Sequence, residues 1–240
     1  MGGYRYRMQK ETYEIDGRLC DVISFGEPRL LLLQPVDEHD LDGLEREAAL
    51  IAETESPFAL AAFKVEDWNR ELSPWDAPPA FGSQGFGHDA SRTLAFAERV
   101  LLPEVIERRK LPENIPVILG GYSLAALFAL WSACQSERFA GIAAASPSVW
   151  FPGWVDYAER HIPKARCVYL SLGDREEKTK NKLMSRVGDC IRKQRALLTD
   201  SVVSCTLEWN EGNHFRDSDI RCAKGFAWCM RQITGSVTTK

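Results

Sequence analysis

The stretch VILGGYSLAALFAL, Val117 to Leu130, holds one serine between an apolar run and an alanine-rich run. The apolar residues that end at Leu119 predict a buried strand, and the residues from Leu124 to Cys134 predict a helix. Between them, the residues GYSLA have the form G-x-S-x-[G/A], in which a sharp strand-to-helix turn exposes a serine at the end of a sheet. The serine either caps a helix or is a nucleophile, and its position between strand and helix favours the second interpretation.

The rest of the chain alternates short apolar runs with helical patterns. The predicted strands are Leu30–Pro35, Phe58–Val65, Pro116–Leu119, Phe139–Ala145, Cys167–Leu172 and Val203–Trp209. The predicted helices are Leu41–Ala52, Ala90–Arg109, Leu124–Cys134, Lys178–Leu198 and Asp219–Ile233. Continuous apolar strands that alternate with helices indicate an α/β protein with a doubly wound, mostly parallel sheet and helices on both faces. We expect one domain over residues 1–240, with a long loop from Ser73 to Gly87.

The composition argues against several classes of partner. Thirty basic and 34 acidic residues give a net charge of −4, so no broad basic face for nucleic acid or an anionic membrane is expected. No run reaches the roughly 18 apolar residues of a membrane span, and the N-terminus is charged where a signal peptide would be apolar. Seven cysteines lie scattered without metal-ligand spacing, which indicates reduced thiols and a cytoplasmic protein.

A serine nucleophile needs a base, which in this topology follows a later strand. His214, directly after the last predicted strand, has the expected position. His161 precedes a strand and is interpreted as an exposed loop residue. His88 opens a helix and is interpreted as a helix-cap residue, and His39 as a surface residue.

The acid that orients the histidine should follow the strand between serine and histidine. Asp174, Glu176 and Glu177 all follow Cys167–Leu172. Asp174 is closest to the sheet but has a short side chain, whereas Glu177 fits a helix start, where the helix dipole favours an acid. Glu176 is the first choice and Asp174 the second.

Several ordered blocks resemble one family. GGYSLAALFAL and SERFAGIAAASPSVWF, with WNRELSPW before them and SLGDREE and EGNHF after them, resemble the α/β-hydrolase esterases grouped with ferric enterobactin (enterochelin) esterase catalytic domains. The resemblance covers roughly Phe58 to Ile233. It implies an α/β-hydrolase fold, an acid three residues after Gly173, and Trp150 as an aromatic residue that lines the substrate pocket. The sequence departs from the family in two ways. Ala125 stands where glycine is usual. The N-terminal accessory domain typical of siderophore esterases is not expected in this sequence, which argues against a siderophore substrate.

Acyl transfer also needs two N–H groups that stabilise the oxyanion. The N–H of Leu124, the residue after the serine, is expected to be the first of these donors. The second donor is expected within Lys64–Asp67, after the strand Phe58–Val65.

These residues predict a serine hydrolase that cleaves small carboxylic esters without a metal or other cofactor. Ser123 is the nucleophile, His214 the general base and Glu176 the orienting acid. An acyltransferase with the same residues is the nearest alternative. A non-catalytic binding protein with the hydrolase fold is the second alternative.

Overall fold

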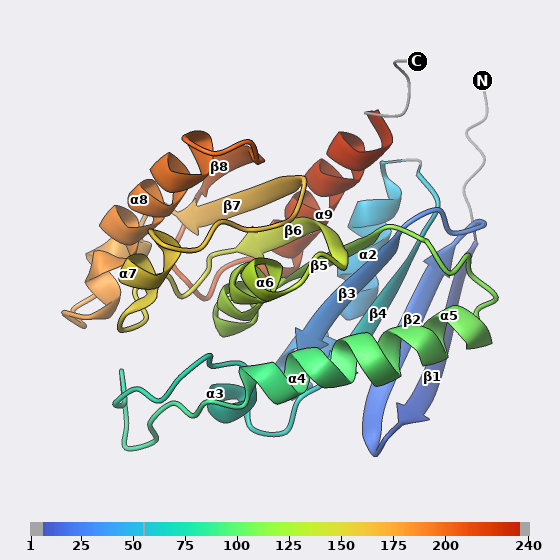
Figure 1. Cartoon of the computed structure of the whole chain (residues 1–240), viewed down its shortest axis with the longest axis horizontal. Coiled ribbons are helices and arrows are strands. Elements are labelled where there is room, and N and C mark those ends of the chain that lie inside the picture. The colour runs from blue at the N-terminus through green and yellow to red at the C-terminus, as the bar shows by residue number, and fades with distance from the viewer. Residues whose placement is uncertain (1–6, 55, 236–240) are drawn as a thin grey trace.

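The computed structural model describes residues 7–54 and 56–235, and these residues form one eight-stranded sheet (Figure 1). The strands are β1 (Met8–Ile15), β2 (Arg18–Phe25), β3 (Leu31–Val36), β4 (Phe58–Lys64), β5 (Val117–Tyr122), β6 (Phe139–Ala145), β7 (Cys167–Gly173) and β8 (Ser204–Asn210). They lie in the order β1-β2-β4-β3-β5-β6-β7-β8. β1 and β2 pair antiparallel and β2 pairs antiparallel with β4, whereas β4, β3 and β5 to β8 are parallel. The mostly parallel sheet predicted from the sequence is confirmed.

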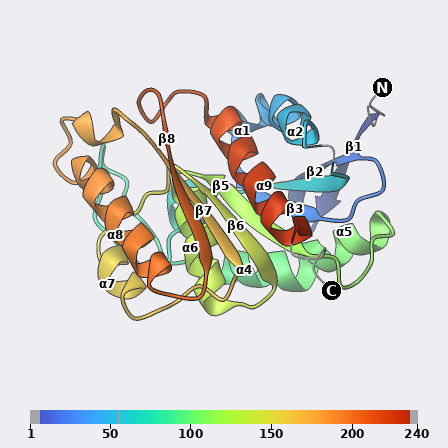
Figure 2. The same ribbon diagram turned by 90° about the horizontal axis from the view of Figure 1, so that it is seen from above.

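Helices cover both faces of the sheet, as Figure 2 shows from above. The helices are α1 (Glu38–Leu41), α2 (Leu44–Ala52), α3 (Trp68–Glu71), α4 (Ala90–Phe96), α5 (Leu102–Arg108), α6 (Leu124–Gln135), α7 (Trp154–Ala158), α8 (Val187–Thr199) and α9 (Ser218–Gly235). α2 and α9 contribute to one buried apolar cluster, and α4 to α8 contribute to the other, larger one. Because both faces are covered, β3 and β5 are buried along their whole length, which explains their continuous apolar sequences.

Two parts of the chain differ from the prediction. The hairpin of β1 and β2 was not expected, because β1 is largely polar and exposed and buries only Ile15. The predicted helix Lys178–Leu198 forms only from Val187 onward. Two short 3₁₀ turns, Glu176–Lys178 and Met184–Arg186, precede it. The side chain of Asn181 accepts the N–H groups of Leu183 and Met184, which holds this segment as a turn and competes with an α-helix.

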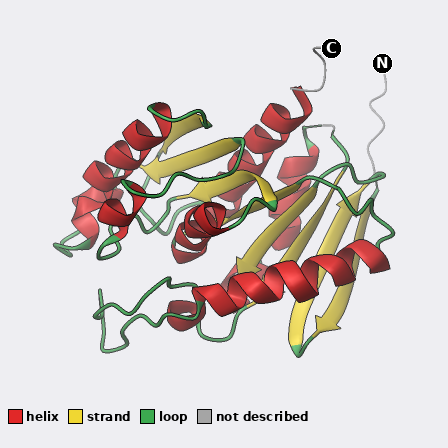
Figure 3. Ribbon diagram, viewed as in Figure 1, coloured by secondary structure: helices red, strands yellow, loops and turns green. Residues whose placement is uncertain are grey.

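The predicted loop Ser73–Gly87 is present and extends away from the sheet between α3 and α4 (Figure 3). An isolated bridge between Ala77 and Phe86 closes it, and Asn181 donates to the carbonyl of Ala80 at 2.6 Å. The segment predicted as helix Ala90–Arg109 is α4 and α5 joined by a π-helical turn, Ala97–Leu101.

Within residues 7–54 and 56–235, no helix combines the length and the apolar character that crossing a membrane requires.

The turn between β5 and α6 depends on a glycine. A Cβ atom at Gly121 would lie 2.6 Å from the Cβ of Ala125, so only one of these two positions has room for a side chain. This contact explains how alanine is accommodated at position 125, because Gly121 leaves the space that its methyl group fills.

We therefore predict that Gly121→Ala destabilises the protein by about 1–3 kcal/mol, the usual cost of overpacking. Ala125→Gly in the same chain removes the clashing methyl group, so the double variant should be more stable than the sum of the single effects predicts. Urea unfolding of the four proteins measures this coupling. Strictly additive effects would contradict the packing argument.

Candidate active site

Ser123 occupies a strained turn between β5 and α6. Its backbone has φ 57° and ψ −116°, and a positive φ is unusual for a residue other than glycine. Its N–H donates to Ala145 O on β6 at 3.1 Å, and its carbonyl accepts the N–H groups of Leu127 at 3.1 Å and Ser148 at 3.0 Å. These bonds to β6, α6 and the loop after β6 hold the conformation, which leaves the hydroxyl group at the carboxyl end of the sheet.

Three of the predicted residues form one hydrogen-bonded chain. Ser123 Oγ lies 2.9 Å from His214 Nε2, and His214 Nδ1 lies 2.7 Å from Glu176 Oε2. An ionised carboxylate can only accept, so Nδ1 carries the proton and Nε2 has the lone pair that faces the serine. His214 is therefore in the tautomer that can accept the proton of Ser123.

Glu176 is 6% exposed, and both of its oxygen atoms are hydrogen-bonded. Oε1 accepts bonds from Gly173 N–H at 2.7 Å, Ser146 Oγ at 2.7 Å and Arg221 Nη1 at 2.8 Å. Burial alone raises the pKa of the carboxyl group. The hydrogen bond and charge of His214, with the bonds from Gly173 and Ser146, outweigh burial and lower the pKa of Glu176 below its usual value. The carboxylate is therefore ionised at neutral pH.

Arg221 on α9 is the buried counter-ion, which the sequence analysis missed. It is 1% exposed, and Nη1 also donates to the hydroxyl group of Tyr122 at 2.9 Å. Nη2 donates to the carbonyls of Glu211 at 3.2 Å and Asn213 at 3.0 Å. One feature of the sequence could have identified Arg221. It is a charged residue on the apolar face of a helix, because it lies four residues before the buried Gly225.

The other acids near the sheet edge have different partners. Asp174 is exposed, and its carboxylate accepts Gly212 N–H at 2.8 Å. Glu177 pairs with Arg192, with an oxygen to nitrogen distance of 3.1 Å. Of the three acids considered, the structure brings only Glu176 to His214.

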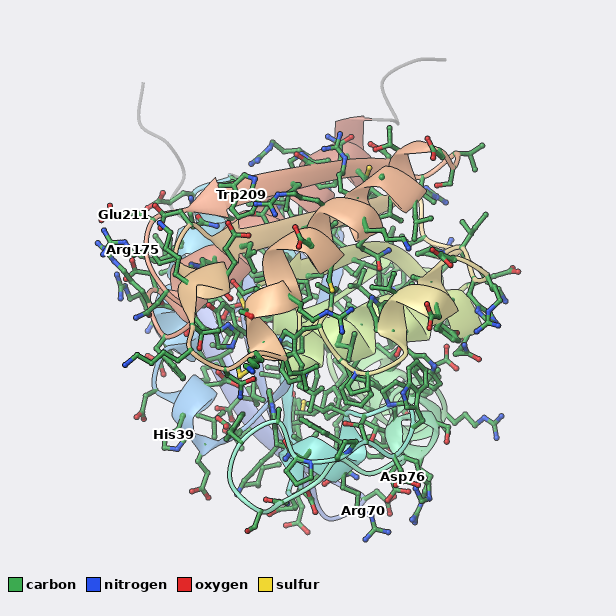
Figure 4. The ribbon with its side chains drawn as sticks, turned by 90° about the vertical axis from the view of Figure 1, so that its left-hand side faces the viewer. His39, Arg70, Asp76, Arg175, Trp209 and Glu211 are labelled. Carbon is green, nitrogen blue, oxygen red and sulfur yellow. The ribbon has the colours of Figure 1, made fainter. Side chains whose placement is uncertain are left out.

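The remaining histidines lie apart from this chain of hydrogen bonds. His161 is exposed and stacks on Tyr157 with ring centroids 4.0 Å apart. His88 is exposed and pairs with Asp76 at 2.9 Å, and this hydrogen bond and charge raise the pKa of the imidazole. His39 is exposed on α1. Figure 4 shows His39 and Asp76 well separated from Arg175, which neighbours Glu176 in the chain.

The expected location of the second oxyanion donor is wrong. β4 is separated from β5 by β3, so the loop after β4 is not the one beside Ser123. Its N–H groups also have partners: Val65 donates to the carbonyl of Val36 at 3.0 Å, and Glu66 and Asp67 donate to the Glu71 carboxylate at 2.8 and 2.9 Å. Leu124 is the first residue of α6, so its N–H has no acceptor within the helix.

A cavity of about 390 Å³ lies against His214. Its lining residues are Ser146, Trp150, Arg175, Glu176, Lys178, Thr179, Met184, Val187, Asn213, His214 and Phe215. Trp150 is 7% exposed and packs edge-on against Phe86 with ring centroids 6.1 Å apart, so it belongs to the core and also lines the cavity. Among the residues that the structure describes, no group of three or more His, Cys, Asp or Glu side chains could hold a metal ion.

The strand order, the serine turn after β5 and the histidine after β8 define an α/β-hydrolase fold. Several solved structures have a similar fold. An IroE-like serine hydrolase from Shewanella oneidensis has a TM-score of 0.73 at 15% identity, over 92% of this chain and 79% of that chain. The siderophore hydrolase EstA from Aspergillus nidulans has a TM-score of 0.62 at 17% identity, over 98% and 95%. The enterobactin esterase FES from Shigella flexneri has a TM-score of 0.66 at 15% identity, over 94% of this chain and 60% of that chain. No protein-family model and no curated protein matches the sequence.

The contacts of Glu176 predict unequal effects of two conservative substitutions. Glu176→Gln removes the charge that faces His214 and should lower kcat on 4-nitrophenyl acetate by about 10⁴, the cost seen when a triad histidine loses its carboxylate. Asp174→Asn keeps a carbonyl oxygen for Gly212 N–H and should stay near wild type. A large loss of kcat in Asp174→Asn, with Glu176→Gln near wild type, would assign the orienting acid to Asp174.

The lowered pKa of Glu176 also predicts how stability depends on pH. The ionised carboxylate stabilises the folded state above its usual pKa of 4.5, and this contribution is lost as the pH falls below that value. The difference in unfolding free energy between wild type and Glu176→Gln should therefore shrink on acidification from about pH 5 to pH 3, measured by urea unfolding. A constant difference across this range would contradict the predicted linkage.

Proposed function

We propose that the protein is a serine hydrolase that cleaves carboxylic esters through an acyl-enzyme intermediate. The observation that carries the proposal is the continuous hydrogen-bonded chain from Ser123 Oγ to His214 at 2.9 Å and from His214 to Glu176 at 2.7 Å. A nucleophile within reach of a base, which is itself oriented by a third group, is the arrangement that activates a hydroxyl group.

The first half of the proposed reaction acylates the serine. The hydroxyl proton of Ser123 passes to His214 Nε2 while Oγ bonds to the carbonyl carbon of the ester. The carbonyl oxygen becomes an oxyanion, and Glu176 stabilises the imidazolium that forms. The tetrahedral intermediate then breaks its bond to the alcohol oxygen, which takes the proton from Nε2 and leaves. In the second half, water attacks the acyl-enzyme by the same proton transfers, which release the acid and restore Ser123.

The oxyanion needs two donors, and we assign the first to the N–H of Leu124. We assign the second to the turn between β3 and α1. β3 is the parallel neighbour of β5, so the carboxyl ends of both strands lie at the same edge of the sheet. Glu38 is the first residue of α1, and its N–H has no acceptor within that helix.

The comparisons support this reaction class and small-molecule esters as substrates. The similar folds include proteins described as a serine hydrolase, a siderophore hydrolase and an enterobactin esterase. With the sequence blocks around Ser123, Glu176 and His214, they favour a relative of the enterochelin esterases, with Trp150 in the substrate pocket.

All seven cysteines are free thiols, which supports a reducing, cytoplasmic location.

The proposal predicts that Ser123→Ala abolishes both labelling by a fluorophosphonate probe and hydrolysis of 4-nitrophenyl acetate. His214→Ala should lower kcat by at least about a thousandfold, in line with the loss of a triad member in other serine hydrolases. His161→Ala is the matched control and should retain full activity, because that ring stacks on Tyr157. Normal turnover by Ser123→Ala would disprove the proposed nucleophile, and products formed with an added alcohol would distinguish an acyltransferase.

A further inference from the structure

The segment between β7 and α8 is basic, although the whole chain has a net charge of −4. Its cations are Arg175, Lys178, Lys180, Lys182 and Arg186. Its acids are Asp174, Glu176 and Glu177, so the segment has five basic and three acidic residues. Two of these acids have cationic partners, since Glu176 pairs with Arg221 at 2.8 Å and Glu177 pairs with Arg192 at 3.1 Å. Asp174 accepts the backbone N–H of Gly212 instead. The positive charge of this segment is therefore a local feature of an acidic protein.

Arg175 and Lys178 line the cavity beside His214, whereas Lys180 and Lys182 do not. The backbone N–H of Arg175 donates to Gly212 O at 3.1 Å, which fixes this residue to the turn that carries His214. The rest of the lining includes the aromatic rings of Trp150 and Phe215, and Phe215 is 90% exposed. The cavity thus combines two cations with apolar surface next to the proposed base.

Neither cation has an ion-pair partner among the described residues. Figure 4 shows Arg175 at the outer edge of this face, with Glu211 labelled near it. Glu211, however, pairs with Arg216 at 2.9 Å. Asp174, the neighbour of Arg175 in the chain, accepts a backbone N–H group instead. Arg175 and Lys178 are both exposed, so their charges face the cavity and solvent without an internal counter-ion.

We propose that this cavity binds the alcohol part of the ester and that this part carries a carboxylate. The inference rests on the proposed function, because His214 must return its proton to the leaving oxygen. The leaving alcohol therefore lies beside His214, where Arg175 and Lys178 are within the same cavity. A guanidinium group matches a carboxylate with two parallel hydrogen bonds, and Lys178 adds a second charge. The volume of about 390 Å³ suits a small aromatic hydroxy acid.

The test compares 3-acetoxybenzoate with its neutral isostere 3-acetoxybenzamide. Both esters give the same acetyl-enzyme, so their kcat/KM values differ only through binding and acylation. Each value is divided by the rate of alkaline hydrolysis, which removes the intrinsic difference between the leaving groups. Wild type should prefer the carboxylate by about fivefold, the order expected for an exposed ion pair. This preference should fall as salt screens the charges.

Variants identify the cations that cause the preference. Arg175→Met and Lys178→Met should each lower the preference and together abolish it, because kcat/KM for 3-acetoxybenzoate falls more than kcat/KM for 3-acetoxybenzamide. Lys180→Met lies on the same segment outside the cavity and should keep the full preference. No preference in wild type, or an equal loss in Lys180→Met, would overturn the proposal while leaving the ester hydrolase intact.

A binding measurement keeps the proposal testable without catalysis. Calorimetric titration of the wild-type protein with 3-hydroxybenzoate and 3-hydroxybenzamide should show tighter binding of the carboxylate, and Arg175→Met should remove the difference. Equal binding of the two phenols would overturn the anionic site, even if neither acetyl ester is hydrolysed.

Discussion

The carboxylate of Glu176 is a buried charge, and the arrangement of the active site depends on how that charge is compensated. A buried carboxylate is tolerated only when it is paired and hydrogen-bonded. Arg221 supplies the opposite charge at 2.8 Å, and Gly173 N–H and Ser146 supply two more donors to the same oxygen. The other oxygen is left for His214, at 2.7 Å. The bonds that stabilise the charge therefore also fix the direction in which the carboxylate faces the imidazole.

Arg221 also forms hydrogen bonds with the segments that carry His214 and Ser123. It donates to two carbonyls of the turn that carries His214, and to the hydroxyl group of Tyr122, which precedes Ser123. Tyr122 in turn donates to the carbonyl of His214 at 2.8 Å. Helix α9 thus links the ends of β5, β7 and β8, and the distances from serine to histidine and from histidine to acid are set together.

The sequence predicted the parts of this arrangement that are local. The glycine, serine and alanine of the β5–α6 turn have fixed spacing, and strand order places the acid and His214 at one edge of the sheet. Arg221 was missed because its side-chain partners Glu176 and Tyr122 lie 45 and 99 positions away in the chain, and no local pattern records such contacts. The oxyanion loop was assigned to the wrong strand because the crossover that places β3 beside β5 is a property of the sheet. The β1–β2 hairpin was missed because a largely exposed strand has no apolar run.

The central claim is that this ordered chain of groups makes Ser123 a nucleophile that carries an acyl group during turnover. Mass spectrometry of the wild-type protein, quenched in acid shortly after mixing with excess 4-nitrophenyl acetate, tests it directly. The account predicts one added acetyl group per molecule, located by peptide mapping on Ser123. Turnover of the ester without an acetylated Ser123 peptide, or with the acetyl group on another residue, would contradict it.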